Sequence, residues 1–246
     1  LIKTVRDTGV EVAVLAIDPS SPFTGGAILG DRVRMQDHAE DAGVFIRSMA
    51  TRGHLGGLAL ATPQAIRVID AAGYPFVLIE TVGVGQAEVE IAGRADTTIV
   101  VVNPGWGDAV QANKAGLLEV ADIFVINKAD RPGARDTARD LEMMLELTTH
   151  KEWRPPIIET IAADGSGVAE LWASVGEHRE FLESTGALVA RRERRIRDEL
   201  REILVHRLEE RAHDLLGTDE FNGLQQQVVA RETDPWAAAD QLLERI

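Results

Sequence analysis

Hydrophobic residues gather in short runs along the first two-thirds of the chain, and longer segments of mixed character separate them. The runs have strand length and are apolar at consecutive positions, which is typical of strands covered on both faces. The intervening segments Pro63–Ala72, Asp108–Val120 and Ala134–Leu147 predict helices. The predicted strands are Val12–Ile17, Val44–Ile46, Phe76–Ile79, Thr98–Val102, Ile123–Ile126 and Ile157–Ile161. This alternation predicts an α/β fold with a doubly wound, mostly parallel sheet.

The pattern changes to helix alone after about residue 185. Apolar residues then recur at steps of three, four or seven with charged residues between them, which predicts a long amphipathic helix. They are Ile196, Leu200, Ile203, Leu204, Leu208 and Leu215. Two shorter helices are predicted at Asp219–Ala230 and Asp234–Arg245. We therefore expect an α/β domain at residues 1–184 and a helical arm at residues 185–246.

Composition and charge narrow the functional classes. The chain has 246 residues with a formal charge of −14 and no Cys, which excludes disulfides and thiolate metal sites. Its longest apolar runs are too short to cross a bilayer, and it shows no secretory pattern, so the cytoplasm is expected. Net negative charge disfavours nucleic acid. The basic run at residues 191–197 is interpreted as a solvated helix face with intrahelical charge pairs, because acidic residues match the arginines around it.

The strongest local motif is Asn127-Lys128-Ala129-Asp130, directly after a predicted buried strand. A carboxylate such as Asp130 can accept hydrogen bonds from both the ring N–H and the exocyclic amine of guanine, whereas adenine offers no such pair of donors. The stem of Lys128 can cover the purine face. A polar turn is the simpler alternative, but the place after a strand of a nucleotide-binding type of sheet favours guanine recognition.

Two carboxylates, Asp18 and Glu80, follow two other predicted strands. Carboxylates at the mouths of neighbouring strands suit Mg²⁺ that bridges phosphate oxygens, although a turn cap and a surface acid are the alternatives. Gly83 would let a backbone N–H approach the terminal phosphate. Asp31 could reach the metal or the attacking water, and Arg32 or Arg34 could meet phosphate charge. A charged helix start is the alternative for these last residues.

A phosphate loop of the form Gly-x-x-x-x-Gly-Lys-Ser/Thr is not found in the sequence. None of its four lysines, Lys3, Lys114, Lys128 and Lys151, follows a glycine. That loop ordinarily joins the first strand to the first helix, and here the chain opens on a predicted helix at Leu1–Arg6. We therefore expect the first strand and the phosphate loop to lie upstream of Leu1.

Together these motifs resemble the MeaB/ArgK/MMAA family of GTPases. The resemblance rests on Asp18-Pro19-Ser20-Ser21, Gly30-Asp31-Arg32-Val33-Arg34-Met35, residues 45–53, Glu80-Thr81-Val82-Gly83-Val84-Gly85-Gln86 and Asn127-Lys128-Ala129-Asp130. The family belongs to the SIMIBI class of P-loop GTPases. The resemblance implies Asp18 and Glu80 as magnesium ligands, and Asn127, Lys128, Asp130, Ala162 and Ala163 as guanine-binding residues. It implies catalytic roles for Asp31, Arg34 and Gly83.

The resemblance also implies a function. Family members bind GTP and GDP with Mg²⁺, hydrolyse GTP slowly, and act as chaperones that gate the loading of adenosylcobalamin into methylmalonyl-CoA mutase or a related acyl-CoA mutase and protect that enzyme. It further implies a homodimer held by the helical arm, with no nucleic-acid or membrane partner. Residues 103–114 resemble a loop that couples nucleotide state to the mutase, with Trp106 either an exposed anchor or a ring packed on its own domain.

Three other functions remain open. A nickel-insertion GTPase of the same class would need a relay of Cys and His, but the chain has no Cys and its six His are scattered. A kinase would need selectivity for ATP, which Asp130 opposes. A non-catalytic dimeric scaffold on a nucleotide-binding fold would require that the phosphate loop be truly absent.

Overall fold

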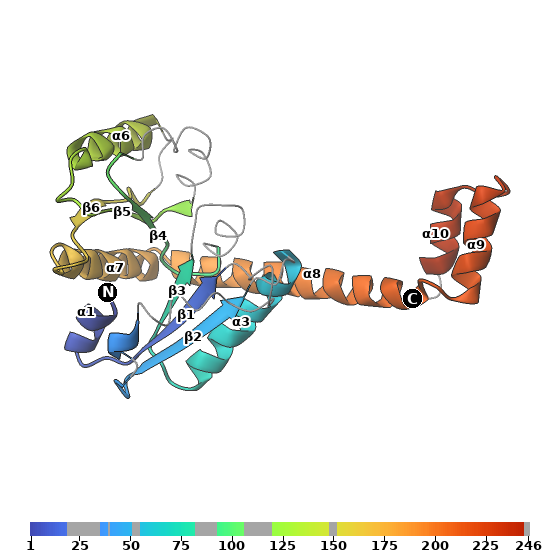
Figure 1. Cartoon of the computed structure of the whole chain (residues 1–246), viewed down its shortest axis with the longest axis horizontal. Coiled ribbons are helices and arrows are strands. Elements are labelled where there is room, and N and C mark those ends of the chain that lie inside the picture. Colours follow the sequence, from blue (N-terminus) through green and yellow to red (C-terminus); the bar gives the residue numbers. More distant parts are fainter. Residues whose placement is uncertain are drawn as a thin grey trace. The chain divides into compact units, whose positions relative to one another are not determined.

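The computed structural model describes residues 1–18, 35–38, 40–50, 55–81, 93–105, 120–147 and 152–243. Asp31, Arg34 and Gly83 lie outside the described residues, as does the predicted helix Asp108–Val120 apart from its last residue. The chain divides into two compact units, Leu1–Arg195 and Ile196–Ile246. The first unit carries every strand found in the described residues, and Figure 1 shows these strands and the helices.

The first three strands form one parallel sheet. Helix α1 (Ile2–Asp7) leads into β1 (Val12–Asp18), and β2 (Val44–Ala50) follows the short 3₁₀ helix Gln36–His38. Helix α3 (Leu55–Ala71) then connects to β3 (Phe76–Thr81). The strand order is β2-β1-β3, with β1 buried along its apolar length. Residues Ala65, Ile66 and Ile69 of α3 pack on Ala13 and Leu15 of the sheet.

The second parallel sheet has the order β4-β5-β6, formed by Ile99–Val102, Ile123–Asn127 and Ile157–Thr160. Helix α6 (Ala134–Leu147) covers one face, where Leu141 packs with Phe124 and Ile126. Helix α7 (Val168–Ser184) covers the other, where Leu171 packs with Ile123 and Val125. Helices on both faces of a parallel sheet confirm the predicted doubly wound α/β fold.

The observed elements differ from the predicted ones mainly at their ends. Strand β2 continues to Ala50, and β3 includes Glu80, because polar residues there still pair with β1. Helix α3 begins at Leu55, so Pro63 lies inside it rather than at its start. Helix α7 had not been predicted. Its buried face mixes apolar residues with Ser174 and His178, which breaks the apolar period that reveals a helix.

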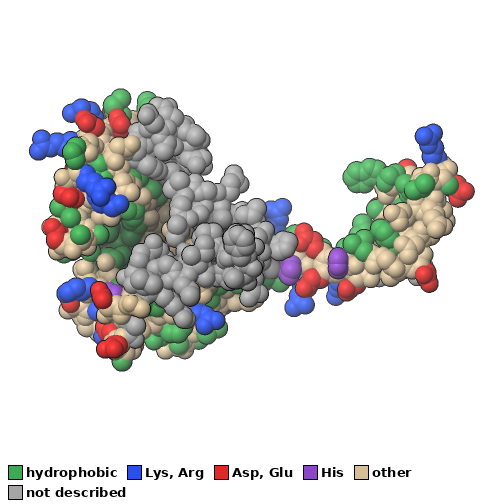
Figure 2. Space-filling view, in the orientation of Figure 1, with side chains coloured by type: hydrophobic (Ala, Val, Ile, Leu, Met, Phe, Trp, Pro, Cys, Tyr) green, Lys and Arg blue, Asp and Glu red, His purple; other side chains and the backbone are tan. Residues whose placement is uncertain are grey.

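The C-terminal helices are α8 (Ala187–Leu215), α9 (Asp219–Val229) and α10 (Pro235–Leu243). Thr218 caps α9 by accepting a hydrogen bond from the Phe221 amide, and Asp234 caps α10 by accepting from the Trp236 amide. The division between the two units falls inside α8, after Arg195. In the second unit, hydrophobic side chains face outward on the helices (Figure 2). No helix in the described part of the chain is long and apolar enough to cross a membrane.

Candidate functional site

The predicted base-binding motif lies at the carboxyl end of β5, tied to the end of β6. Asn127 is the last residue of β5, and its Oδ1 accepts hydrogen bonds from the Thr160 hydroxyl at 3.3 Å and the Ala162 amide at 3.1 Å. The Ala129 amide donates to the carbonyl oxygen of Thr160 at 3.1 Å. The structure therefore brings the loop after β5 and the loop after β6 together through the Asn127 side chain.

The loop that follows Asn127 has an unusual backbone. Lys128 has a φ of 58°, in the left-handed region, and its carbonyl oxygen accepts from the Arg131 amide. The side chains of Lys128 and Asp130 are exposed, so a ligand can reach both. Gly133 ends the loop, and a Cβ there would lie 3.6 Å from the backbone nitrogen of Gly105. The base-binding loop thus packs against the turn after β4.

The loop after β6 is a compact turn. The carbonyl oxygen of Ile161 accepts from the amides of Asp164 and Gly165, and the Ile161 amide donates to Ser166. Asp164 accepts from the Ser166 amide at 2.8 Å, which lowers the pKa of this exposed carboxyl group. Ala162 and Ala163 lie exposed at the top of the turn. The structure therefore holds both predicted alanines beside Asn127, in a turn organised by its own backbone.

The predicted metal ligands lie in the other sheet. Asp18 ends β1, while Glu80 lies in the neighbouring strand β3 opposite Ala16. The carboxyl ends of parallel strands share one edge, so both acids sit where ligands bind in such sheets. The described residues hold no group of three or more His, Cys, Asp or Glu that could bind a metal. Two carboxylates suit Mg²⁺, which keeps several waters and takes further ligands from phosphates.

Thr160 takes part in this site although no sequence motif pointed to it. It is the last residue of β6 and is only 3 % exposed. Its hydroxyl donates a hydrogen bond to Asn127 Oδ1. The one available signal was a hydroxyl-bearing residue near the end of an apolar strand, two residues before Ala162 of the predicted Ala162-Ala163 loop.

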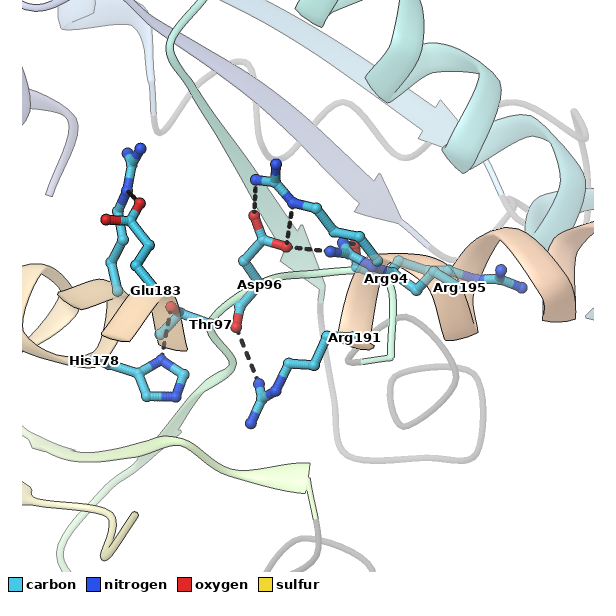
Figure 3. A network of polar contacts seen from close by, with 9 residues as sticks. Arg94, Asp96, Thr97, His178, Glu183, Arg191 and Arg195 are labelled. Atoms are coloured by element: carbon cyan, nitrogen blue, oxygen red, sulfur yellow. Dashed lines mark hydrogen bonds and ion pairs between the residues drawn. The ribbon is translucent and has the colours of Figure 1, made fainter. Parts of the chain in front are cut away.

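A second polar cluster lies at the opposite, amino ends of β4 and β5, and Figure 3 shows the part of it around Thr97, His178, Asp96 and Arg191. Asp122 precedes β5, and its carboxylate accepts from Arg191 of α8 at 2.8 Å and from the Thr98 amide at 2.9 Å. His178 of α7 is fully buried, with Nε2 at 3.3 Å from Asp122 and Nδ1 at 2.9 Å from the Thr97 hydroxyl oxygen. Burial disfavours a charged Asp122, but His178, Arg191 and the Thr98 amide lower its pKa to about 2.

Asp96 binds the next arginines of α8. Its carboxylate pairs with Arg192 at 2.7 Å and also with Arg195. Burial raises the pKa of Asp96, but these two arginines lower it overall. The predicted intrahelical charge pairing of the basic run was therefore wrong at Arg191, Arg192 and Arg195, although Arg192 does remain exposed to solvent. Their partners, Asp96 and Asp122, lie about 70 to 100 residues away in sequence, which charge counting along one helix does not detect.

Comparison with known proteins identifies the family. Residues 1–215 match the family described as methylmalonyl Co-A mutase-associated GTPase MeaB. The chain belongs to the MeaB family. A GTPase of Pyrococcus abyssi is 51 % identical over 250 residues, which cover all of this chain and 77 % of the relative. The GTPase ArgK of Escherichia coli is 41 % identical over 73 % of this chain and 56 % of its own.

The fold of this chain is also similar to that of a solved structure. The crystal structure of an LAO/AO transport system kinase matches 98 % of this chain and 74 % of its own, with a TM-score of 0.65 and 26 % identity. The chain is thus a member of a GTPase family with the α/β fold of P-loop GTPases and helices at its C-terminal end. The resemblance inferred from the motifs is confirmed.

Proposed function

We propose that this MeaB-family protein binds GTP and GDP at the carboxyl ends of β5 and β6 and hydrolyses GTP slowly. The observation that carries the proposal is the Asn127 side chain, held by Thr160 and Ala162 between the loops that bear Asp130 and Ala163. That arrangement supports Lys128 and Asp130 at an exposed edge of the sheet, where a base can enter. Asp130 then supplies selectivity for guanine, because only guanine offers its paired donors.

Magnesium belongs to the same proposal. Asp18 and Glu80 would hold the ion, which would stabilise negative charge on the phosphates as water attacks the terminal phosphoryl group. Asp31, Arg34 and Gly83 are proposed to act on that water and on the terminal phosphate. In this proposal residues 1–184 form the GTPase domain, residues 185–246 form a helical arm, and the protein works in the cytoplasm without nucleic acid or membrane.

The nucleotide proposal is tested by calorimetric titration of the full-length protein with GDP and with ADP in the presence of Mg²⁺. We expect GDP to bind at micromolar concentration or tighter and ADP to show no binding. Asp130→Asn keeps one acceptor oxygen but replaces the other with an amino donor, so it can no longer accept from both guanine donors. This change should lower GDP affinity at least 10-fold, since charge-assisted hydrogen bonds contribute about 1.5–3 kcal/mol each. If neither GDP nor ADP binds, the GTPase proposal is contradicted and a scaffold on a nucleotide-binding fold remains.

We further propose that the partner is adenosylcobalamin-dependent methylmalonyl-CoA mutase or a related acyl-CoA mutase, and that nucleotide state gates loading of its cofactor. The family description supports this partner. The test is binding of the full-length protein to purified methylmalonyl-CoA mutase, measured with GDP and with a non-hydrolysable GTP analogue. Because a switch must prefer one state, we expect the two affinities to differ by about 5-fold or more. Equal affinities would contradict gating, and no binding would contradict the partner.

A further inference from the structure

The hairpin formed by α9 and α10 buries a small core of its own and leaves its largest aromatic side chain outside. Leu224 of α9 and Ala238 of α10 are 8 % and 6 % exposed, whereas Trp236 is 82 % exposed. Leu243, which is 59 % exposed, lies two helical turns after Trp236, so both are on one face of α10. Figure 2 shows hydrophobic side chains gathered on this hairpin. Apolar side chains left together on a surface mark sites of interaction.

The backbone of Trp236 is held in place before any partner arrives. Asp234 caps α10, and its Oδ1 accepts from the amides of Trp236 at 2.9 Å and Ala237 at 3.1 Å. Pro235 begins the helix with a φ that is already close to helical. Only the two side-chain torsions of Trp236 therefore remain to be fixed on binding. Rigid aromatic side chains of this kind are enriched among the residues that dominate the binding energy of protein interfaces.

The charge around this face selects the kind of partner. Residues 216–243 carry one basic residue, Arg231, against five acidic residues, which are Asp219, Glu220, Glu232, Asp234 and Asp240. Asp240 follows Trp236 by one helical turn and so shares its face of α10. A second copy of this hairpin would bring acids opposite acids, and anionic lipid headgroups would be repelled in the same way. A partner that is both apolar and basic is complementary in both respects.

The length of the face fits a helix. Because α10 has nine residues, the face is about 14 Å long and can lie along about two to three turns of another helix. We propose that the face of α10 that bears Trp236, Asp240 and Leu243 docks a basic amphipathic helix of another protein. The apolar side chains of that helix would pack on Trp236 and Leu243, and its basic residues would pair with Asp240 and the neighbouring acids. The residues that match the family end at 215, so this surface goes beyond the proposed GTPase function.

The test uses synthetic helical peptides as probes and the full-length protein, with binding measured by fluorescence anisotropy of a label on the peptide. One peptide of about 18 residues, long enough to form a helix, carries Leu on one face and Lys on the other. A second peptide has Glu in place of each Lys. A third has the composition of the first in scrambled order, which controls for general attraction of a basic peptide to a protein of charge −14. We expect the basic amphipathic peptide to bind about 10-fold tighter than either of the others, because only this peptide offers both an apolar face and opposite charge.

Substitutions on α10 show whether the peptide binds at this face. Trp236→Ala removes the anchor and should weaken binding of the basic amphipathic peptide about 10-fold or more. Asp240→Asn removes one exposed charge and should weaken it about 2- to 5-fold. The matched controls are Leu147→Ala and Asp136→Asn, which change exposed residues of α6 in the first unit and should leave the affinity unchanged.

Equal affinity for the three peptides, no binding of the basic amphipathic peptide, or wild-type affinity in Trp236→Ala would overturn the proposal. Light scattering and vesicle sedimentation test the other occupants. A Trp236→Ala protein that changes from dimer to monomer would assign this face to a second copy and overturn the proposal. Binding to phosphatidylcholine vesicles that Trp236→Ala abolishes would assign the face to lipid and overturn it as well. None of these measurements uses a nucleotide, so their outcome is independent of whether GDP binds.

Discussion

At the scale of single residues, the turn after β6 depends on the absence of a side chain at Gly167. Its φ is 75°, and a Cβ would lie 2.1 Å from the carbonyl oxygen of Glu159. Glu159 precedes Thr160, so the backbone that would have to move carries the residue that holds Asn127. Gly165 also has a positive φ of 86°, but nothing lies within 4 Å of its Cβ position. Alanine at either position would strain the backbone, but only alanine at Gly167 would also overlap with neighbouring atoms. Comparing the two substitutions therefore separates the cost of strain from the cost of steric overlap.

We predict that Gly167→Ala lowers the free energy of unfolding by about 2–4 kcal/mol. Alanine is strained in the left-handed conformation, and its methyl group would overlap with the backbone of Glu159. It should also weaken GDP binding, whereas Gly165→Ala should cost only about 1 kcal/mol and leave binding near wild type. Urea unfolding and calorimetric titration measure the two effects. Gly176, in α7 with open space at its Cβ position, provides a helical control in which alanine should not destabilise. Equal stability of the 165 and 167 variants would contradict the steric argument.

At the scale of elements, the first turns of α8 are anchored to the amino ends of β4 and β5 by acid–base pairs. Arg191 binds Asp122, while Arg192 and Arg195 bind Asp96. Asp122 is more buried than Asp96, and it also accepts a hydrogen bond from the Thr98 amide. A charged group held in this way stabilises the fold only while it remains ionised.

The pKa of Asp122 gives this anchor a defined pH dependence. Its pKa in the folded protein is about 2, below the ordinary 3.8, so its stabilisation is complete above about pH 5 and is lost as the pH falls from about 4 toward 2. We expect that loss to be about 2 kcal/mol. Asp122→Asn should be less stable at pH 7 by about 2–4 kcal/mol, because Arg191 loses its partner. Urea unfolding between pH 7 and pH 3 should show the difference between wild type and variant shrinking with acid; a constant difference would contradict the assignment.

At the scale of the whole molecule, an apolar stripe runs along the middle of α8, from Ile196 to Leu208. Ile196, Leu200, Leu204 and Leu208 recur every four residues and are 46–62 % exposed. Residues four apart share one helix face, so the four side chains form a continuous strip of about three turns. Burial of such a strip is favourable by about 25 cal/mol per Å². This surface supports the homodimer that the family resemblance implies.

We predict that the full-length protein is a dimer in solution and that Leu200→Glu with Leu204→Glu yields monomers. Two charges on the stripe would have to be desolvated at the interface, which costs several kcal/mol. Light scattering after size exclusion, over a range of protein concentrations, measures the mass. Arg201→Glu, a charge change at an exposed polar residue next to the stripe, should leave the dimer intact. A wild-type protein that stays monomeric at every concentration, or a double variant that stays dimeric, would contradict the prediction.

Much of the fold could be predicted because the relevant signals are local. The buried strands show consecutive apolar residues, and α6 has a clean helical period, so its bounds at Ala134 and Leu147 were predicted to the residue. Helix α7 was missed because Ser174 and His178 interrupt its buried face. The buried His178 is tolerated because its ring nitrogens lie beside Asp122 and Thr97, which belong to other parts of the chain.

In the candidate site, too, some features follow from the local sequence and others only from the tertiary structure. The sequence alone determined the residue types that suit guanine, phosphate and magnesium, and their places at strand ends, because motif chemistry depends on neighbours along the chain. The tertiary structure alone decided that Asn127 is held by Thr160 and Ala162, and that Asp122 anchors Arg191. Those partners are separated by 33 to 69 residues, and only the parallel pairing of strands and the packing of helices on them set such distances.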